Sequence, residues 1–483
     1  MAVRIQRWLE AQGFSSNPFE FWEADRETTL SSYFVRAEWF DALRGDTKRP
    51  RSAVLFAPRG HGKSSHRLEI ARLCGEASAT DPALIVQITE YDWIMAEGLE
   101  RVTSQRYLQY VARRAALALW DGLQRSQGRR AAFAADARHL LRLHGLLRWS
   151  AGAGALLPQL DLPAADLPAL ALQYRLNAPP DTLPEALVDA AAGYYGHAQQ
   201  TEILGDLVQL AQAARYASIY VLVDRVDEDA LTEHNTDATL RLIQPLISNL
   251  HMIEFPGLAF KFFLPDHIGE AMLQQRVSRI EERVPTYTLT WHDSDLHELL
   301  ALRLRYYSRL GATGDIGAVN AFQDLCERGC DADAMLVAAA QGSPRRLIML
   351  ANKVIEAHCQ VADDLESKIG AATFRDKFQS SIPRLYLDSA GYIWLDRKRQ
   401  PTQLTKLPRK LLEFLWENRT RYVSKDEVER VLYAYGERTP DALYKVVKRL
   451  RKQIEPRLVN SKNYIDFVEG HGYRLQNFED SSV

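Results

Sequence analysis

The strongest constraint on this chain is a short apolar segment that leads into a glycine-rich loop and then into a helical pattern. The apolar segment is residues 53–56 (AVLF), and the loop is residues 57–64 (APRGHGKS). The residues that follow place apolar side chains at helical spacing. Backbone N–H groups of such a loop, and the positive end of the following helix, can face phosphate oxygens. We therefore predict a strand, a phosphate-binding loop and a helix.

The side chains of the loop have expected roles. Lys63 is expected to reach the β- and γ-phosphates of a nucleotide, and Ser64 is expected to bind Mg²⁺. Ala57 stands where such loops usually begin with glycine, which matters only if that position needs a positive φ. The residues expected to contact the nucleotide are Pro58, Arg59, Gly60, His61, Gly62, Lys63, Ser64 and Ser65.

A second apolar segment ends in a cluster of acids. Residues 219–223 (IYVLV) precede Asp224, and Asp227 and Glu228 follow shortly afterwards. A carboxylate at the end of a strand beside the loop can hold Mg²⁺ through water, and this is the role expected of Asp224. A later acid must orient the attacking water, and we prefer Glu228, although spacing alone does not separate it from Asp227. The two motifs together predict binding and slow hydrolysis of ATP, with Mg²⁺.

Further apolar runs at residues 83–89 and 258–264 favour an α/β fold whose parallel sheet is covered on both faces. Residues from about 95 to 215 are rich in Ala, Leu and Arg, and we predict a helical insertion there. The predicted organisation is a lead-in segment at residues 1–50, an ATPase core at 51–290, a helical lid at 291–378 and a small α+β domain at 383–476.

The pattern of residues 383–476 is typical of a winged helix, with a short hairpin, three helices and a second hairpin. Ser424 and Glu427 form a capping box at the start of the second helix, and Pro440 suits the first turn of the third. In the third helix, the residues expected to face the core are Leu443, Val446, Val447, Leu450 and Ile454. The cations expected on its other faces are Lys445, Lys448, Arg449, Arg451 and Lys452.

Positive charge is concentrated in this domain. Residues 404–476 hold 16 Lys or Arg and 10 Asp or Glu, a balance of +6, whereas the whole chain has a formal net charge of −2. We therefore predict that double-stranded DNA binds to the cations of the third helix and to Arg474 of the final hairpin. No apolar run is long enough to cross a bilayer and no secretory signal is visible, so we expect a cytoplasmic protein with no membrane partner.

The glycine-rich loop, the pattern Asp224-x-x-Asp227-Glu228 and the run Gly342-Ser343-Pro344-Arg345 together resemble the STAND branch of the AAA-like P-loop ATPases, which are related to the origin-recognition ATPases. The resemblance implies that Arg345 contacts the nucleotide from the far side. It also implies that the chain assembles into a homo-oligomer on ATP binding. Arg225, directly after the first acid, favours the STAND group over a DNA loader.

Residues 383–476 resemble the OmpR-type winged helix of response regulators, which implies a third helix in the major groove and a wing against the DNA backbone. The preferred function is a regulatory ATPase of a bacterial signalling or defence kind. Its nucleotide state would control DNA binding or assembly through the winged helix, together with an unknown protein partner. The alternatives are a DNA-loading ATPase of origin-recognition type and a winged helix that acts as an internal switch without binding DNA.

Overall fold

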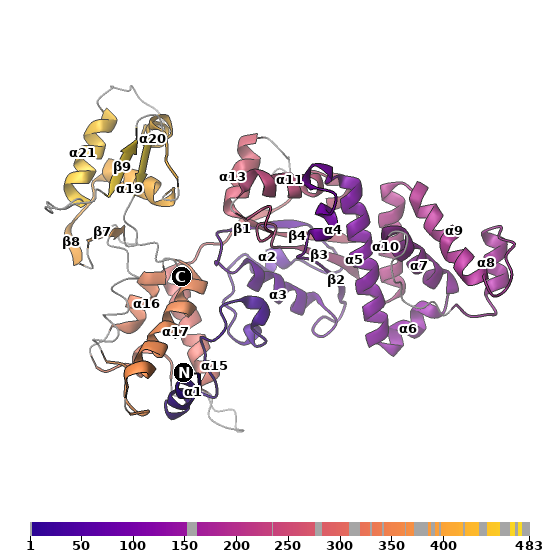
Figure 1. Ribbon diagram of the computed structural model, residues 1–483, viewed down its shortest axis with the longest axis horizontal. Coiled ribbons are helices and arrows are strands. Elements are labelled where there is room, and N and C mark those ends of the chain that lie inside the picture. Colours follow the sequence, from indigo (N-terminus) through magenta and orange to yellow (C-terminus); the bar gives the residue numbers. More distant parts are fainter. Residues whose placement is uncertain are drawn as a thin grey trace. The chain divides into compact units, whose positions relative to one another are not determined.

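The structure is a computed structural model, whose described residues form two compact units. The sheet unit comprises Pro18–Tyr306 and Gly342–Ile348, and the winged-helix unit comprises Met1–Asn17, Tyr307–Gln341 and Met349–Val483. Figure 1 labels many of the helices and strands of both units. The described residues are 2–151, 162–233, 235–275, 283–308, 319–328, 331–340, 342–362, 364–370, 385–387, 392–395, 398–418, 421–433, 442–454, 464–468 and 472–475.

The sheet unit is built on a parallel sheet of five strands in the order β2-β3-β4-β1-β5. The strands are β1 (Ala53–Ala57), β2 (Ala83–Ile88), β3 (Ser218–Val223), β4 (Leu258–Pro265) and β5 (Thr286–Thr288). The predicted α/β architecture is confirmed, and β5 was missed because it has three residues and two of them are polar. Since the strands are parallel, their carboxyl ends lie along one edge of the sheet.

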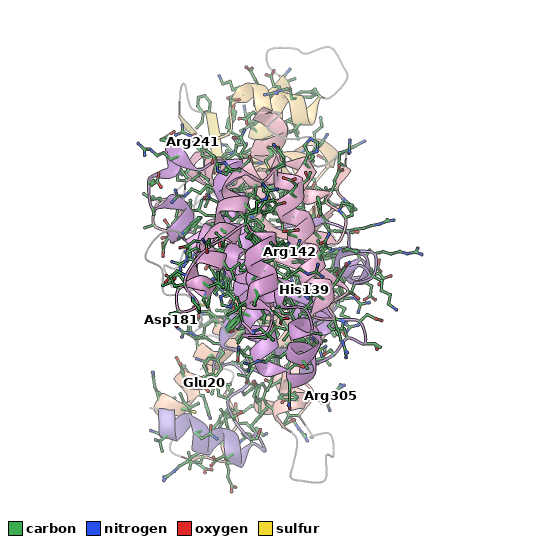
Figure 2. All side chains as sticks on the ribbon, turned by 90° about the vertical axis from the view of Figure 1, so that its right-hand side faces the viewer. Glu20, His139, Arg142, Asp181, Arg241 and Arg305 are labelled. Carbon is green, nitrogen blue, oxygen red and sulfur yellow. The ribbon has the colours of Figure 1, made fainter. Side chains whose placement is uncertain are left out.

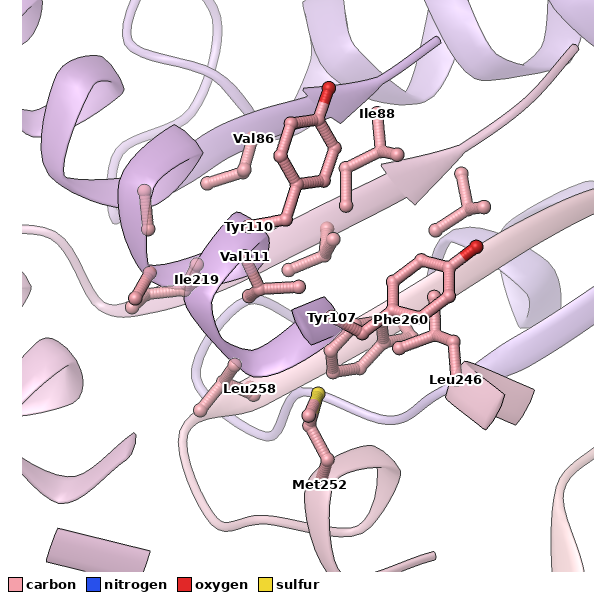
Figure 3. Packing of buried hydrophobic residues seen from close by; sticks show 14 of the residues in the cluster. Val86, Ile88, Tyr107, Tyr110, Val111, Ile219, Leu246, Met252, Leu258 and Phe260 are labelled. Carbon is pink, nitrogen blue, oxygen red and sulfur yellow. The ribbon is translucent and has the colours of Figure 1, made fainter. Parts of the chain in front are cut away.

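Both faces of the sheet are covered. On one face, α5 (Ser104–Arg125) places Tyr107 and Val111 in a core with Val86, Ile219 and Phe260 (Figure 3). On the other face, α2 (Phe40–Arg44) and α3 (Lys63–Cys74) contribute to a second core, whose members include Phe40, Leu43, Leu55, Ile70 and Leu222. This cover explains why β1, β3 and β4 are buried along their whole length.

Between β2 and β3 the described residues form helices and no strand. These helices are α4 (Asp92–Met95), η3 (Leu99–Arg101), α5, α6 (Gln127–Ala134), α7 (Ala137–Ala151), α8 (Leu167–Gln173), α9 (Leu183–His197) and α10 (Gln200–Ala213). Arg142 of α7, labelled in Figure 2, forms an ion pair with Asp206 of α10. The hydroxyl of Tyr195 donates to the same carboxylate at 2.9 Å, so Asp206 ties α7, α9 and α10 together.

The other helices of the sheet unit connect its strands or precede them. They are η1 (Ala24–Arg26), η2 (Leu30–Ser32), α11 (Thr236–Ile247), α12 (Leu250–Ile253), α13 (Asp266–Gln275) and α15 (Asp293–Tyr307).

The winged-helix unit begins with α1 (Ala2–Ala11), η4 (Phe322–Leu325), α16 (Ala332–Ala340) and α17 (Pro344–Val361), of which the first turn belongs to the sheet unit. Trp8 of α1 is buried against the ring of His358, and its Nε1 donates to the Ser367 carbonyl oxygen at 2.9 Å. The amino-terminal helix is therefore anchored on α17 and the segment after it.

The C-terminal part of this unit has the predicted winged-helix elements. They are β6 (Leu385–Leu387), β7 (Tyr392–Leu395), β8 (Lys398–Gln403), α19 (Lys406–Glu417), α20 (Lys425–Leu432), α21 (Ala442–Ile454), β9 (Ile465–Val468) and β10 (Gly472–Leu475). β8 was not predicted, because its sequence KRQPTQ has no apolar residue. The capping box is present: Glu427 N donates to Ser424 Oγ at 3.2 Å, and Ser424 N donates to Glu427 Oε2 at 2.7 Å. Pro440 lies outside the described residues.

The first residue of β10 must be a glycine. Gly472 has a φ of +102°, which residues with a side chain rarely adopt. The neighbouring Tyr473 exchanges two backbone hydrogen bonds of 2.8 Å with Val423, at the start of α20. A Cβ on Gly472 would lie 2.0 Å from the Val423 carbonyl oxygen, so any other residue breaks this pairing.

A lysine is buried in the middle of β4. Lys261 is 1% exposed, and its Nζ donates to the Arg51 carbonyl oxygen at 2.6 Å, beside the ring of Tyr220. Burial lowers the pKa of Lys261 to about 7 from its ordinary value of 10.5. Below about pH 7 both the folded and the unfolded chain bind this proton, and above 10.5 neither does. Between these values only the unfolded chain binds it, so stability rises with pH.

We predict that the free energy of unfolding of the sheet unit rises between about pH 7 and about pH 9, by up to about 1.4 kcal/mol per pH unit. The Lys261→Met variant should lack this rise, because it has no proton to lose at this position. Denaturant unfolding followed by tryptophan fluorescence measures it. Lys48→Met, which replaces an exposed lysine, is the control and should leave the rise intact. An equal rise in the Lys261→Met variant would contradict the assignment.

Candidate functional site

The glycine-rich loop joins β1 to α3 with two residues in the left-handed region. Gly60 has a φ of +81° and Gly62 a φ of +95°, which glycine adopts without strain. Ala57 ends β1 and has no positive φ, so the missing glycine at that position costs nothing. α3 begins at Lys63, and the N–H groups of its first turn therefore have no acceptor within the helix.

Lys63 lies at the centre of this loop. Its side chain is buried, and Nζ donates to the carbonyl oxygens of Ala57 at 2.8 Å and Pro58 at 3.2 Å. Burial lowers the pKa of the Lys63 ammonium. The negative charges of Asp227 and, to a lesser degree, Asp224 oppose this lowering. The ammonium is thus held over the loop, next to acids that arrive from β3.

Both sequence motifs line one pocket of about 270 Å³ in the sheet unit. From the loop it is lined by Arg59, Gly60, Gly62, Lys63, Ser64 and Ser65. The predicted acids Asp224, Asp227 and Glu228 line it from the end of β3, together with Arg345. Pro58 and His61 do not line it: the Pro58 oxygen accepts from Lys63, and the His61 oxygen accepts from Trp291 Nε1 at 2.8 Å.

Arg345 is positioned by direct contact between the first turn of α17 and the loop. Arg345 N donates to the Gly60 carbonyl oxygen at 3.3 Å, and Ser343 Oγ donates to the same oxygen at 3.4 Å. A Cβ on Gly60 would lie 3.3 Å from the Cβ of Arg345. The run that carried the family resemblance therefore packs on the loop itself.

Asp224 is buried and paired with a residue that the sequence did not single out. Arg67 of α3 donates from Nε to Asp224 Oδ2 at 3.0 Å, and both side chains are almost fully buried. The other oxygen of Asp224 accepts from Arg225 N at 2.9 Å. Removing one partner of a buried pair costs about 3–5 kcal/mol, because the other charge is left uncompensated.

The ion pair continues into a chain of alternating charges. Arg67 also bonds Asp25 and Gln87, and Asp25 in turn bonds Arg225. Arg225 has a φ of +63°, and its Nε lies 3.5 Å from Glu228 Oε2. The segment around Asp25, which also lines the pocket, is thereby fixed to both motifs.

The two candidate bases differ in their surroundings. Glu228 lies in an ion pair with Arg225, and burial raises the pKa of its carboxyl group. Asp227 is the acid whose charge acts most on Lys63. Both acids line the pocket, so the preference for Glu228 stays a prediction.

The residues expected to hold Mg²⁺ do not fit that ion in this arrangement. Ser64 and Asp224 line the same pocket, as the sequence predicts. The Asp224 carboxylate, however, is already compensated by the buried guanidinium of Arg67, and its second oxygen accepts a backbone hydrogen bond. A divalent ion held by Asp224 would lie beside a fixed positive charge.

An apolar pocket adjoins the polar one. The two share Trp22, Glu23, Ala24, Gly62, Ser65, Pro344 and Ile348. The apolar pocket is further lined by Phe21, Leu30, Tyr33, Phe34, His66 and Trp291. Burial lowers the pKa of His66 to about 4, so its ring is neutral. Nδ1 donates to the Gly62 carbonyl oxygen at 2.9 Å, which leaves Nε2 as an acceptor with no partner among the described residues.

The aromatic segment of this pocket is held in place by a buried arginine. Arg303 of α15 donates to the Pro18 carbonyl oxygen at 2.8 Å, to that of Phe21 at 3.2 Å and to the Glu27 carboxylate at 2.8 Å. Its guanidinium carbon lies 4.6 Å from the centre of the Tyr33 ring. The residues before β1 are therefore part of the site, whereas the sequence analysis predicted only a lead-in segment there.

The basic face of the winged helix follows the predicted pattern. The five predicted core positions of α21 are buried, and Lys445, Lys448, Arg449 and Lys452 are exposed. Arg451 differs, because its guanidinium donates to the Ile465 carbonyl oxygen of β9 at 2.7 Å. Arg474 of β10 is half-buried, with its guanidinium carbon 4.6 Å from the centre of the Tyr422 ring.

Residues 399–475 match a protein family. It is described as transcriptional regulatory protein, C terminal, and the matched residues run from β8 to β10. The match confirms the predicted winged helix and supports DNA binding by this domain, but it does not extend into residues 1–398. Comparison with curated proteins gave no match. Over the described part of the chain, no helix combines the length and apolar character needed to cross a membrane.

Proposed function

We propose that the sheet unit binds ATP and that the bound nucleotide regulates DNA binding by the C-terminal winged helix. The observation that carries the proposal is the junction of the two pockets. A polar pocket that contains a glycine-rich loop, a lysine and an arginine opens beside an apolar pocket with aromatic walls. Triphosphate and base require these two environments side by side.

The phosphate end of the nucleotide is supported by three features. The N–H groups at the start of α3 attract anions, and Lys63 and Arg345 add two positive charges to the lining of the pocket. Arg345 is the second residue of α17, so contact with a terminal phosphate can be coupled to that helix. Slow hydrolysis, and assembly of several copies on ATP binding, remain predictions.

The base end is supported by the aromatic walls and by one acceptor. Phe21, Trp22 and Phe34 offer ring faces, and Nε2 of His66 offers a lone pair in a buried position. The amino group of adenine is a donor that such an acceptor can bind, whereas guanine presents a carbonyl oxygen at the same position. This favours ATP over GTP.

The role of the winged helix rests on its family match and its charge. Four exposed cations lie along α21, and each contact with a DNA phosphate releases counterions. An output domain of this kind, joined to a nucleotide site, fits a regulator better than a DNA loader. The alternative hypothesis is that the winged helix acts as an internal switch and does not bind DNA. The third experiment below distinguishes the two.

Lys63→Ala is expected to weaken ATP binding by about a hundredfold, because a hydrogen bond to a charged group contributes up to about 3 kcal/mol. Calorimetric titration of the full chain with ATP measures the change. Lys48→Ala removes an exposed lysine paired with Asp81 and should leave the affinity unchanged. Equal affinity in the Lys63→Ala variant would place the nucleotide elsewhere.

Glu228→Gln is expected to retain ATP binding and to lower turnover by about 10²–10⁴-fold, the usual contribution of a general base. Release of inorganic phosphate at saturating ATP measures it. Asp227→Asn is the competing variant, and Glu100→Gln, an exposed acid paired with Arg241, is the control. A normal rate in Glu228→Gln together with a slow rate in Asp227→Asn would assign the base to Asp227.

Replacing Lys445, Lys448 and Arg449 together by Ala is expected to weaken duplex DNA binding and to leave ATP binding unchanged. The magnitude of the slope of log affinity against log salt concentration should fall by about 2–3, because three phosphate contacts are lost. Fluorescence anisotropy with labelled duplex over a range of salt concentrations measures it. The control replaces three exposed cations of the sheet unit, Lys48, Arg138 and Arg241. Unchanged affinity in the α21 variant would favour the internal-switch reading.

A further inference from the structure

Arg67 is a buried cation beside the candidate site that the proposed function does not use. It follows Lys63 by four residues on α3, so both side chains leave the same face of the helix. Its guanidinium is 1% exposed and bonds three different side chains, with Nε 3.0 Å from Asp224 Oδ2. The other two partners are Gln87 and Asp25.

These bonds leave Arg67 little freedom to move away. Gln87 belongs to β2 and Asp224 follows β3, so two neighbouring strands hold the guanidinium, and Asp25 holds it from the segment that lines the pocket. Arg225 secures Asp25 a second time. A guanidinium does not lose its proton in a protein, so raising the pH does not remove the charge of Arg67.

The consequence concerns the charge of the triphosphate. In sites of this kind a divalent ion ordinarily offsets the phosphate charge next to an otherwise bare carboxylate. Here the carboxylate is offset by Arg67, and Lys63 and Arg345 face the same pocket with two more positive charges. An ion loaded on Asp224 would compete with Arg67 for Oδ2, and displacing the guanidinium would cost Gln87 its partner and Asp25 one of its two arginines.

We propose that Arg67 replaces the divalent ion as the counter-charge of Asp224, so that the chain binds ATP equally well with and without Mg²⁺. The inference rests on the proposed nucleotide site. It makes the sheet unit a sensor of the nucleotide itself and not of its magnesium complex. It also gives a physical reason for slow turnover, because the carboxylate expected to serve the metal is already occupied.

Equilibrium dialysis of the full chain with radiolabelled ATP, in excess Mg²⁺ and in excess EDTA, tests the inference. The natural chain is expected to bind ATP in the two buffers with affinities that differ by less than about threefold. In Arg67→Met the Asp224 carboxylate loses its buried partner and Asp25 keeps only Arg225, so the site needs another cation. Mg²⁺ should then raise ATP affinity by more than about tenfold.

Two further variants separate charge from structure. Arg67→Lys keeps a cation at this position and should stay insensitive to Mg²⁺. Arg72→Met changes an arginine on the same helix that pairs with Glu69 at 2.7 Å and does not line the pocket, so both affinities should match the natural chain. Thermal unfolding checks that each variant is folded. If Arg67→Met does not fold, the comparison of the natural chain in the two buffers still decides.

The outcomes distinguish this inference from the function on which it rests. A loss of more than about tenfold in EDTA for the natural chain, with tight binding in Mg²⁺, overturns the role of Arg67 and leaves the nucleotide site standing. No Mg²⁺ dependence in a folded Arg67→Met variant overturns it as well. An absence of ATP binding in both buffers overturns both proposals.

Discussion

The parallel pairing of β1, β3 and β4 is the constraint on which the candidate site depends. β4 pairs with β1 on one side and with β3 on the other, so the loop after β1 and the acid after β3 meet at one edge. That edge is covered on both faces, so Asp224 is withdrawn from water and requires a partner. Arg67 supplies it from α3, and the remaining charges follow as a chain from that first pair.

The features that could be predicted from the sequence are local ones. Apolar runs identified β1 to β4, and the spacing of Gly60, Gly62 and Lys63 identified the loop, because each depends on neighbours in the chain. The capping box of Ser424 and the buried face of α21 were predicted for the same reason. Strands β5 and β8 were missed, because one is very short and the other is polar throughout.

The ion pairs of the site could not be predicted, because their partners lie far apart in sequence. Arg67 and Asp224 are separated by 157 residues, and Arg303 and Glu27 by 276. A lone arginine on a helix is ordinarily a solvated side chain, and no local pattern distinguishes the buried exception. For the same reason a count of cations on α21 could not single out Arg451, which bonds β9.

In the final hairpin of the winged helix, the close approach of two backbone segments depends on Gly472 having no side chain. At Gly472 the chain passes so close to the carbonyl of Val423 that only a hydrogen atom fits between them. Because Tyr473 pairs with Val423 beside this crossing, the backbone of β10 is bonded to the segment that leads into α20, in addition to side-chain contacts such as that of Arg451 with β9. The exposed side chains of α21 can therefore change without disturbing this backbone pairing. Position 472 is different: a residue with a side chain there would collide with the Val423 carbonyl oxygen, so the pairing tolerates only glycine.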